Sequence, residues 1–285
     1  MVSIDKVIKS FKLGLKEIYP PQEITAIIEL VFEHFLGFSK TDFILKADKE
    51  LSNMENSKLN EVLKRLKKHE PIQYILGETY FYNLQLKVKP GVLIPRQETE
   101  ELVDLILNEN TGNENLQVLD IGTGSGCIAI ALAANLIKAE VTAFDISDLA
   151  LEIASNNAEL NSVKMNFEKF DILTQSLDSS ERQFEIIVSN PPYILEKEKV
   201  LMQKNVLDFE PELALFVDDH IPLLFYQAIV DYSSIHLKSG GKLYFEINEA
   251  FGNQVEALLT ASGFEQVHLR KDINGKNRMI SGIKY

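Results

Sequence analysis

The chain has 285 residues, of which 45% are hydrophobic, 25% charged and 9% aromatic, as is typical of a globular protein with one large domain or two smaller ones. One cysteine, Cys127, excludes a disulfide framework, and five scattered histidines predict no metal site. No apolar run is long enough to cross a membrane, and the N-terminus lacks the apolar core of a signal peptide, so we expect a cytoplasmic protein.

The net charge of −13 is unevenly distributed along the chain. Residues 1–90 contain 14 Lys and Arg against 12 Asp and Glu, whereas residues 91–285 contain 15 against 30. An acidic second part argues against a protein whose main role is to grip nucleic-acid phosphates. It suits a cationic ligand or a basic partner, or it serves only solubility.

The beginning of the chain has a helical pattern. Apolar residues recur at three- and four-residue spacing, which predicts helices over residues 4–18, 22–36 and 58–69. Pro20-Pro21 separates the first two helices, and Gly37 ends the second. The lysine-rich face of Lys58–Lys68 either docks a partner or is a solvated helix face.

The rest of the chain alternates between strands and helices. Apolar and polar residues alternate over 79–95, with Pro90-Gly91 as a turn signal, which predicts a β-hairpin between two domains. Helices follow at 98–109, 126–137, 148–160 and 221–238, and strands at 116–121, 139–146, 164–170, 184–189 and 241–247. This order predicts a mostly parallel sheet covered on both faces, closed by an antiparallel edge pair at 264–270 and 278–285. Ligands bind such sheets beyond the carboxyl ends of the strands.

A glycine-rich loop follows the first strand of this sheet. Asp120 ends the strand, and the loop runs Gly122-Thr123-Gly124-Ser125-Gly126. A dinucleotide fingerprint would need glycine at the position of Cys127, so the spacing departs from the NAD signature. The loop resembles motif I of the class I S-adenosylmethionine-dependent methyltransferases, where it wraps the amino-acid part of the cofactor. The alternative is a tight turn that uses glycine for steric reasons only.

Two acids end the next strands. Asp145 can accept both ribose hydroxyls of a nucleotide, or it caps the strand or the following helix. Asp171 occupies the place where many methyltransferases contact adenine, or it is a turn residue. The neighbouring Ile146 and Ile172 are expected to contact the cofactor as well. Cys127 is interpreted as a small packed residue rather than a nucleophile.

The sequence Asn190-Pro191-Pro192-Tyr193 follows the fourth strand. An amide nitrogen is a poor nucleophile because its lone pair is delocalised, so an enzyme that methylates it must hold the NH2 group by two acceptors. The Asn190 side-chain oxygen and the Pro191 carbonyl are suitable acceptors, and two prolines stiffen the loop. Tyr193 can stack on the flat acceptor group. We therefore predict catalytic roles for Asn190, Pro191 and Tyr193 and acceptor contacts for Pro192; the alternative is a proline-rich turn.

The chain as a whole resembles the HemK/PrmC family of protein-(glutamine-N5) methyltransferases. The residues that carry the resemblance are Pro71–Gly77, Leu93–Val103, the glycine loop, Asn190–Tyr193, Phe209–Leu215, Asp272, Gly275 and Arg278. One departure is Gln97, where the family usually has proline after Arg96.

The resemblance implies a class I methyltransferase with a Rossmann-like seven-stranded sheet. It implies an N-terminal helical substrate-binding domain (1–75), a β-hairpin linker (76–95) and an S-adenosylmethionine-dependent catalytic domain (96–285) that releases S-adenosylhomocysteine. The acceptor would be the glutamine of the Gly-Gly-Gln tip of class 1 peptide chain release factors.

The same resemblance suggests which residues surround the acceptor glutamine. Arg96, Glu98 and Glu246 are candidates for shaping the acceptor pocket, or they are surface ion pairs and strand-end residues. The segment Phe209–Pro211 either closes over the site or packs as an ordinary loop. We expect a monomer without a stable nucleic-acid or membrane partner. The alternative function is methylation of an adenine amino group in nucleic acid, which requires base flipping and usually a basic recognition surface.

Overall fold

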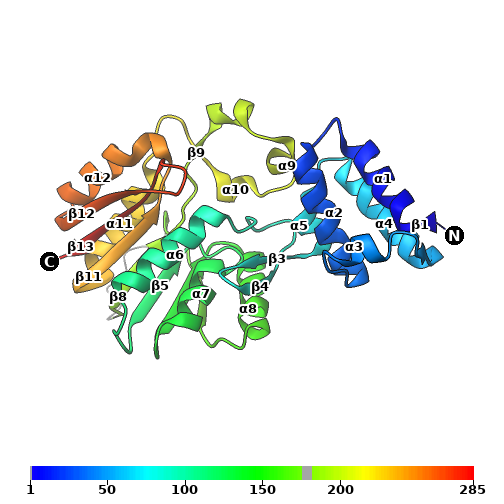
Figure 1. The fold of residues 1–285 in the computed structure, drawn as a ribbon. Coiled ribbons are helices and arrows are strands. Elements are labelled where there is room, and N and C mark those ends of the chain that lie inside the picture. Colours follow the sequence, from blue (N-terminus) through cyan, green and yellow to red (C-terminus); the bar gives the residue numbers. More distant parts are fainter. Residues whose placement is uncertain (1, 175–181) are drawn as a thin grey trace. The chain divides into compact units, whose positions relative to one another are not determined.

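The computed structural model describes residues 2–174 and 182–285, which divide into two compact units (Figure 1). Unit 1 comprises the chain up to Gly77 together with Gln203–Phe209, and unit 2 comprises Glu78–Met202 and Glu210–Tyr285. Within the described residues, no helix has the length and apolar character needed to cross a membrane.

Unit 1 is helical. Its elements are β1 (Val2–Ser3), α1 (Ile4–Leu15), α2 (Pro21–Leu36), α3 (Asp42–Leu45), β2 (Glu50–Leu51), α4 (Asn53–Leu66), α5 (Ile72–Leu76) and α9 (Lys204–Leu207). Helix α4 begins five residues earlier than the predicted residue 58, because Ser52 and Glu55 form a capping box with reciprocal side-chain to backbone bonds of 3.2 and 2.7 Å. The buried faces of α1, α2 and α4 enclose one apolar core.

The predicted hairpin is shorter than expected and belongs to unit 2. Strands β3 (Glu78–Phe81) and β4 (Leu84–Lys87) pair across a two-residue loop of Tyr82 and Asn83, both at positive φ. A turn forms at Pro90-Gly91 as predicted, but it lies beyond β4 and not between the two hairpin strands. The buried Asn157 side chain bonds both the backbone of Lys87 and the Ser125 carbonyl, so the hairpin is tied to the glycine loop.

The seven-stranded sheet has the order β12-β13-β11-β8-β5-β6-β7. Its strands are β5 (Gln117–Ile121), β6 (Glu140–Asp145), β7 (Asn166–Lys169), β8 (Phe184–Ser189), β11 (Leu237–Glu246), β12 (Phe264–Lys271) and β13 (Asn277–Lys284). The five strands from β11 to β7 are parallel, and β13 runs antiparallel between β11 and β12. This confirms the predicted class I methyltransferase sheet with its antiparallel pair.

Helices cover both faces of the sheet (Figure 1). They are α6 (Gln97–Glu109), α7 (Cys127–Asn135), α8 (Asp148–Leu160), α11 (Leu224–His236) and α12 (Gly252–Ala261). Successive strand residues point to opposite faces, so Val118 packs with α6 and α7 whereas Leu119 packs with α11 and α12. Short elements complete the unit: β9 (Ile194–Leu195), η1 (Glu196–Leu201), α10 (Glu212–Leu215), β10 (Phe216–Val217) and η2 (Glu249–Phe251).

The strand order reverses at β5. Its neighbours are β6 on one side and β8 on the other, and both pairs are parallel. The connections after β5 and after β8 therefore leave the same edge of the sheet in different directions. A crevice opens at such a switch point. Here the glycine-rich loop follows β5 and the Asn-Pro-Pro-Tyr motif follows β8, so both motifs lie at this crevice.

Candidate active site

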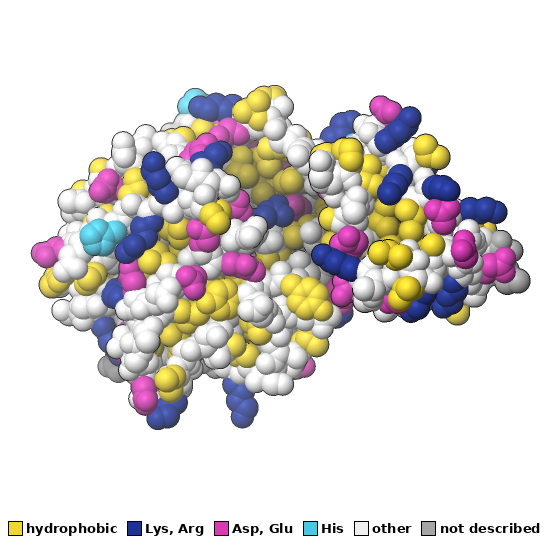
Figure 2. Space-filling model, in the orientation of Figure 1, with side chains coloured by type: hydrophobic (Ala, Val, Ile, Leu, Met, Phe, Trp, Pro, Cys, Tyr) yellow, Lys and Arg dark blue, Asp and Glu magenta, His cyan; other side chains and the backbone are white. Residues whose placement is uncertain are grey.

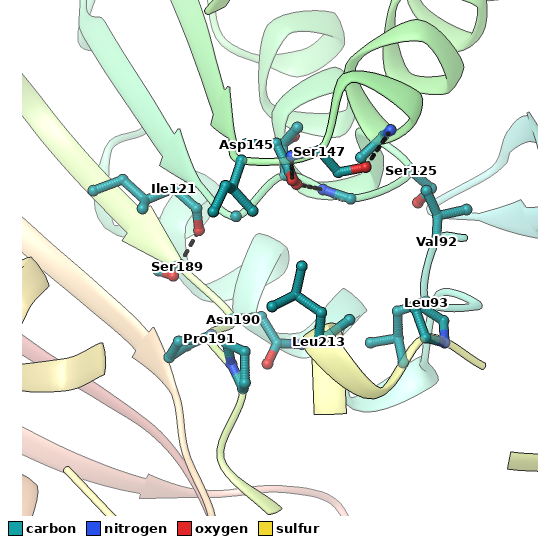
Figure 3. Close-up of a pocket in the computed structure, with 18 of the residues that line it drawn as sticks. Val92, Leu93, Ile121, Ser125, Asp145, Ser147, Ser189, Asn190, Pro191 and Leu213 are labelled. Carbon is teal, nitrogen blue, oxygen red and sulfur yellow. Dashed lines mark hydrogen bonds between the residues drawn. The ribbon is translucent and has the colours of Figure 1, made fainter. Parts of the chain in front are cut away.

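A cavity of about 400 Å3 lies at the carboxyl ends of β5, β6 and β8, within unit 2 (Figure 3). Asp145 and Ser147 border one side of it, and Asn190, Pro191 and Leu213 border the opposite side. The glycine loop and the Asn-Pro-Pro-Tyr motif thus face one shared space, as the strand order requires.

The first four loop residues line the cavity, from Gly122 to Ser125. Gly122 and Gly124 have φ of +76° and +56°, and a Cβ built on either would meet no atom within 4 Å. Their backbone conformation favours glycine, and the space in front of them is open to a ligand. This open cradle fits a ligand group that approaches the loop backbone closely, as S-adenosylmethionine would.

Gly126 has a different role from the other two glycines. It does not line the cavity, and at its φ of +84° an added Cβ would lie 2.9 Å from Ile130 Cδ1 and 3.0 Å from Ala154 Cβ. Ile130 belongs to α7 and Ala154 to α8. The absence of a side chain at Gly126 therefore allows the two helices to pack closely beneath the loop.

Asp120 also lies behind the cavity rather than in its wall. Thr123 Oγ1 donates to its Oδ2 atom at 2.7 Å, and its buried Oδ1 atom has no partner among the described residues. Burial raises the pKa of Asp120 to about 7. Asp120 thus supports the loop from below.

Burial likewise raises the pKa of the cavity residue Cys127 to about 12, so its thiol stays protonated and poorly nucleophilic at neutral pH.

Asp145 and Asp171 both line the cavity. The Asp145 carboxylate accepts the backbone N–H groups of Gly124 and Ser147, each at 2.9 Å, which ties the glycine loop to the end of β6. Ser147, not Asp145, is the N-cap of α8, because its hydroxyl accepts from Ala150 N. Burial raises the pKa of Asp145, and the two N–H donors oppose that shift. Each oxygen retains a further lone pair for a ligand hydroxyl.

Asp171 is a turn residue that also lines the cavity. Its oxygens accept from Leu173 N at 3.0 Å and from Thr174 Oγ1 at 2.6 Å, so it organises the turn after β7. Next to it, Ile146, Phe170 and Ile172 provide an apolar part of the wall. A flat heterocycle would be covered there on its faces while its edge meets polar groups.

The Asn-Pro-Pro-Tyr motif is held against the end of β5. Ser189 Oγ donates to the Ile121 carbonyl at 2.6 Å, and Asn190, Pro191 and Pro192 line the cavity. Tyr193 does not line it: the ring packs against the core, and its hydroxyl donates to Glu246 Oε1 at 2.8 Å. In this geometry the Tyr193 ring supports the motif from behind rather than facing the cavity.

The three residues expected to shape the acceptor pocket lie in different places. Arg96 lines the cavity and donates to Glu210 Oε1 at 2.6 Å, while Glu210 Oε2 accepts from Ile94 N at 3.1 Å. Glu98 and Glu246 lie outside the cavity wall. The ion pair of Arg96 and Glu210 lies just before α10, whose Leu213 lines the cavity on the side opposite Asp145 and Ser147 (Figure 3).

Sequence reasoning missed Thr99. This residue borders the cavity, is 2% exposed, and donates to Glu246 Oε2 at 2.6 Å. Its neighbours on the buried face of α6 are the apolar Leu102, Val103 and Ile106. A polar residue at an otherwise apolar position of an amphipathic helix was the signal that could have identified it.

The sheet order, the glycine loop and the cavity define a class I methyltransferase. Family models agree: "Methyltransferase small domain" matches residues 84–208, and "PrmC N-terminal domain" matches residues 6–77. The chain is similar in fold to a T. thermophilus 16S rRNA N2 G1207 methyltransferase solved with AdoMet and guanosine, with a TM-score of 0.53 and 19% identity over 73% of this chain and 50% of that one.

Curated relatives specify the family. The chain is 46% identical to a release factor glutamine methyltransferase of Flavobacterium psychrophilum, covering 95% of each chain. It is 45% identical to the Bacteroides thetaiotaomicron protein of the same name, covering 98% of this chain and 99% of the relative. The chain therefore belongs to the release factor glutamine methyltransferase family, as its motifs predict.

Proposed function

We propose that this protein transfers a methyl group from S-adenosylmethionine to the side-chain amide nitrogen of the glutamine in the Gly-Gly-Gln motif of class 1 peptide chain release factors. The observation that carries the proposal is the placement of Asn190 and Pro191 across one cavity from the open glycine cradle, in a chain of this family. A cofactor held by the cradle and an NH2 group held by the motif would meet in that space.

The cofactor would be held by residues at or just beyond the carboxyl ends of β5, β6 and β7. The backbone from Gly122 to Ser125 binds its amino-acid part, Asp145 accepts the ribose hydroxyls, and Asp171 with the flanking Ile146 and Ile172 contacts the adenine. When bound, the cofactor supplies a methyl group on a positively charged sulfur. Asp145 and Asp171 are the acidic residues among the described cavity-lining side chains, and they favour a cationic ligand.

The acceptor glutamine would be held by the motif. Asn190 Oδ1 and the Pro191 carbonyl accept the two N–H bonds of its amide, so that the nitrogen lone pair faces the methyl group. Pro191 and Pro192 have no N–H and fixed φ, which holds the carbonyl direction. Because the methyl donor is already activated, the residues have to position the nitrogen rather than act as strong bases. Arg96, paired with Glu210, holds the wall beside the acceptor, and Glu98 and Glu246 act from behind it.

The helical domain (1–75), joined to the catalytic domain (96–285) by the linker (76–95), would bind the body of the release factor, so that both domains hold it. A nucleic-acid adenine acceptor is less well supported by the surface. On the face drawn in Figure 2, Lys and Arg side chains are interspersed with Asp and Glu on both units, and residues 91–285 carry twice as many acidic as basic side chains. The described residues that line the cavity all belong to unit 2. The protein would therefore act as a monomer, without a stable nucleic-acid partner.

The test uses labelled S-adenosylmethionine, the purified protein and three acceptors: a release factor with Gly-Gly-Gln, the same factor with Gly-Gly-Ala, and a DNA duplex. We expect label on the first acceptor alone, with the methyl group located on the glutamine by peptide mass spectrometry. Label on DNA alone would replace the acceptor assignment and keep the methyltransferase. Equal label on both release factors would place the methyl group on another residue.

A further inference from the structure

A chain of hydrogen bonds runs behind Asn190 into the core. Asn190 Nδ2 donates to Thr99 Oγ1 at 3.3 Å, and Thr99 Oγ1 donates to Glu246 Oε2 at 2.6 Å. Tyr193 donates to the other Glu246 oxygen at 2.8 Å. Thr99 and Glu246 are each 2% exposed, so water does not compete for these bonds. The chain joins α6, the end of β11 and the loop after β8.

The direction of these bonds determines the orientation of the Asn190 amide. Burial raises the pKa of Glu246, and the hydroxyls of Thr99 and Tyr193 and the charge of Arg278 oppose that shift. In the structure each carboxyl oxygen of Glu246 accepts one of these two hydroxyls, and an ionised carboxylate has no proton to donate in return. Thr99 has one hydroxyl proton, which goes to Glu246. Its oxygen can then only accept from the Asn190 side chain. The NH2 group of Asn190 is consequently turned towards Thr99, which leaves Oδ1 for another donor.

We propose that Thr99 is a positioning residue that selects the amide orientation of Asn190 in which Oδ1 accepts from the acceptor NH2 group. This inference rests on the proposed function, in which Asn190 Oδ1 holds the glutamine amide. In the flipped orientation, Asn190 would present its own NH2 group to the NH2 group of the substrate. Two donors would face each other, and the acceptor nitrogen would lose one of its two positioning bonds.

The substitution that isolates this role is Thr99→Val, matched by Thr99→Ser. Valine keeps the shape of threonine and removes the hydroxyl, whereas serine keeps the hydroxyl. We expect Thr99→Val to lower kcat about 10–100-fold, the range typical of lost positioning, with cofactor Kd unchanged within about twofold. Thr99→Ser restores kcat to within about threefold of wild type. A Thr99→Val enzyme with wild-type kcat, or a serine variant as slow as the valine variant, overturns the proposal.

A double-mutant cycle separates positioning from general damage. If Thr99 acts through Asn190, adding Thr99→Val to Asn190→Ala lowers kcat no further than Asn190→Ala alone. Fully additive losses would mean that Thr99 acts elsewhere, for instance on the stability of α6. Urea unfolding of each variant shows whether the protein assayed is folded.

A spectroscopic measurement tests the inference without any methyl transfer. The side-chain NH2 signal of Asn190, assigned by its disappearance in Asn190→Ala, is expected to show nuclear Overhauser contacts to the Thr99 side chain in wild-type protein. Failure to find these contacts overturns the inference even if the release factor is methylated. If these contacts are present but the release factor is not labelled, the orientation of Asn190 stands and only the glutamine is rejected as the acceptor, so the failures of the two proposals are distinguishable.

Discussion

The packing at Gly126 yields a quantitative prediction. Its φ of +84° is in the left-handed region, and an added Cβ would lie 3.0 and 3.2 Å from the Cβ and Cα atoms of Ala154. Ile130 Cδ1, at 2.9 Å, is the end of a flexible side chain and can move, but the Ala154 atoms are fixed by α8. Gly126→Ala therefore combines backbone strain with overpacking between two helices.

A matched control exists at Gly112. This exposed glycine has nearly the same φ, +83°, and a Cβ there would meet no atom within 4 Å. Left-handed strain costs about 1–2 kcal/mol at either position, and overpacking adds about 1–3 kcal/mol at Gly126 only. We expect Gly126→Ala to lose about 2–5 kcal/mol of unfolding free energy and Gly112→Ala about 1–2 kcal/mol.

The assay is urea unfolding at 25 °C without cofactor, followed by far-UV circular dichroism. Because the two units can unfold separately, deuterium exchange of peptides spanning α7 and α8 assigns the transition to unit 2. Equal losses for the two variants, with unchanged m-values, would refute the packing argument and leave only the backbone conformation as the reason for glycine at Gly126.

Three further substitutions test the roles assigned to the site. Asn190→Ala is expected to lower kcat about 100-fold or more while cofactor affinity, measured by calorimetry, stays unchanged; loss of cofactor binding would contradict its role on the acceptor. Asp145→Ala should weaken cofactor binding about 10–100-fold, because hydrogen bonds to a charged group contribute about 1.5–3 kcal/mol; an unchanged Kd would remove Asp145 from the ribose. Asp120→Asn removes the ionisable carboxyl group and so tests the pKa of about 7 for Asp120. The unfolded carboxyl ionises near pH 4 and the folded one near 7, so the wild type carries a folding penalty that is absent below pH 4, grows as the pH rises, and reaches about 4 kcal/mol above pH 7. The stability of Asp120→Asn relative to wild type should therefore rise between pH 5 and pH 8 in urea titrations, and a constant difference would contradict the assignment.

The sequence alone determined the elements and the two motifs of the site. Helical spacing, strand alternation and a buried strand leading into a glycine loop are local patterns, so they identified the αβ order that produces the sheet. The same patterns placed the glycine loop and Asn190 at one edge, because parallel strands end together. Where the sequence signal was weaker, as at Ser52 and in the loop of Tyr82 and Asn83, the observed element boundaries differ from the predicted ones by several residues.

Only the tertiary structure decided which of these residues face the cavity. Asp120 and Gly126 belong to the motif but support it from behind, and Tyr193 points into the core. The partners of the Asn190 side chain could not be predicted, since Thr99 lies 91 positions from Asn190 and 147 from Glu246. Contacts of this kind depend on the strand order, which places the end of β11 beside β8 and beneath α6. Short-range periodicity contains no information about such pairs, because it reports which face of an element is buried and not what that face meets.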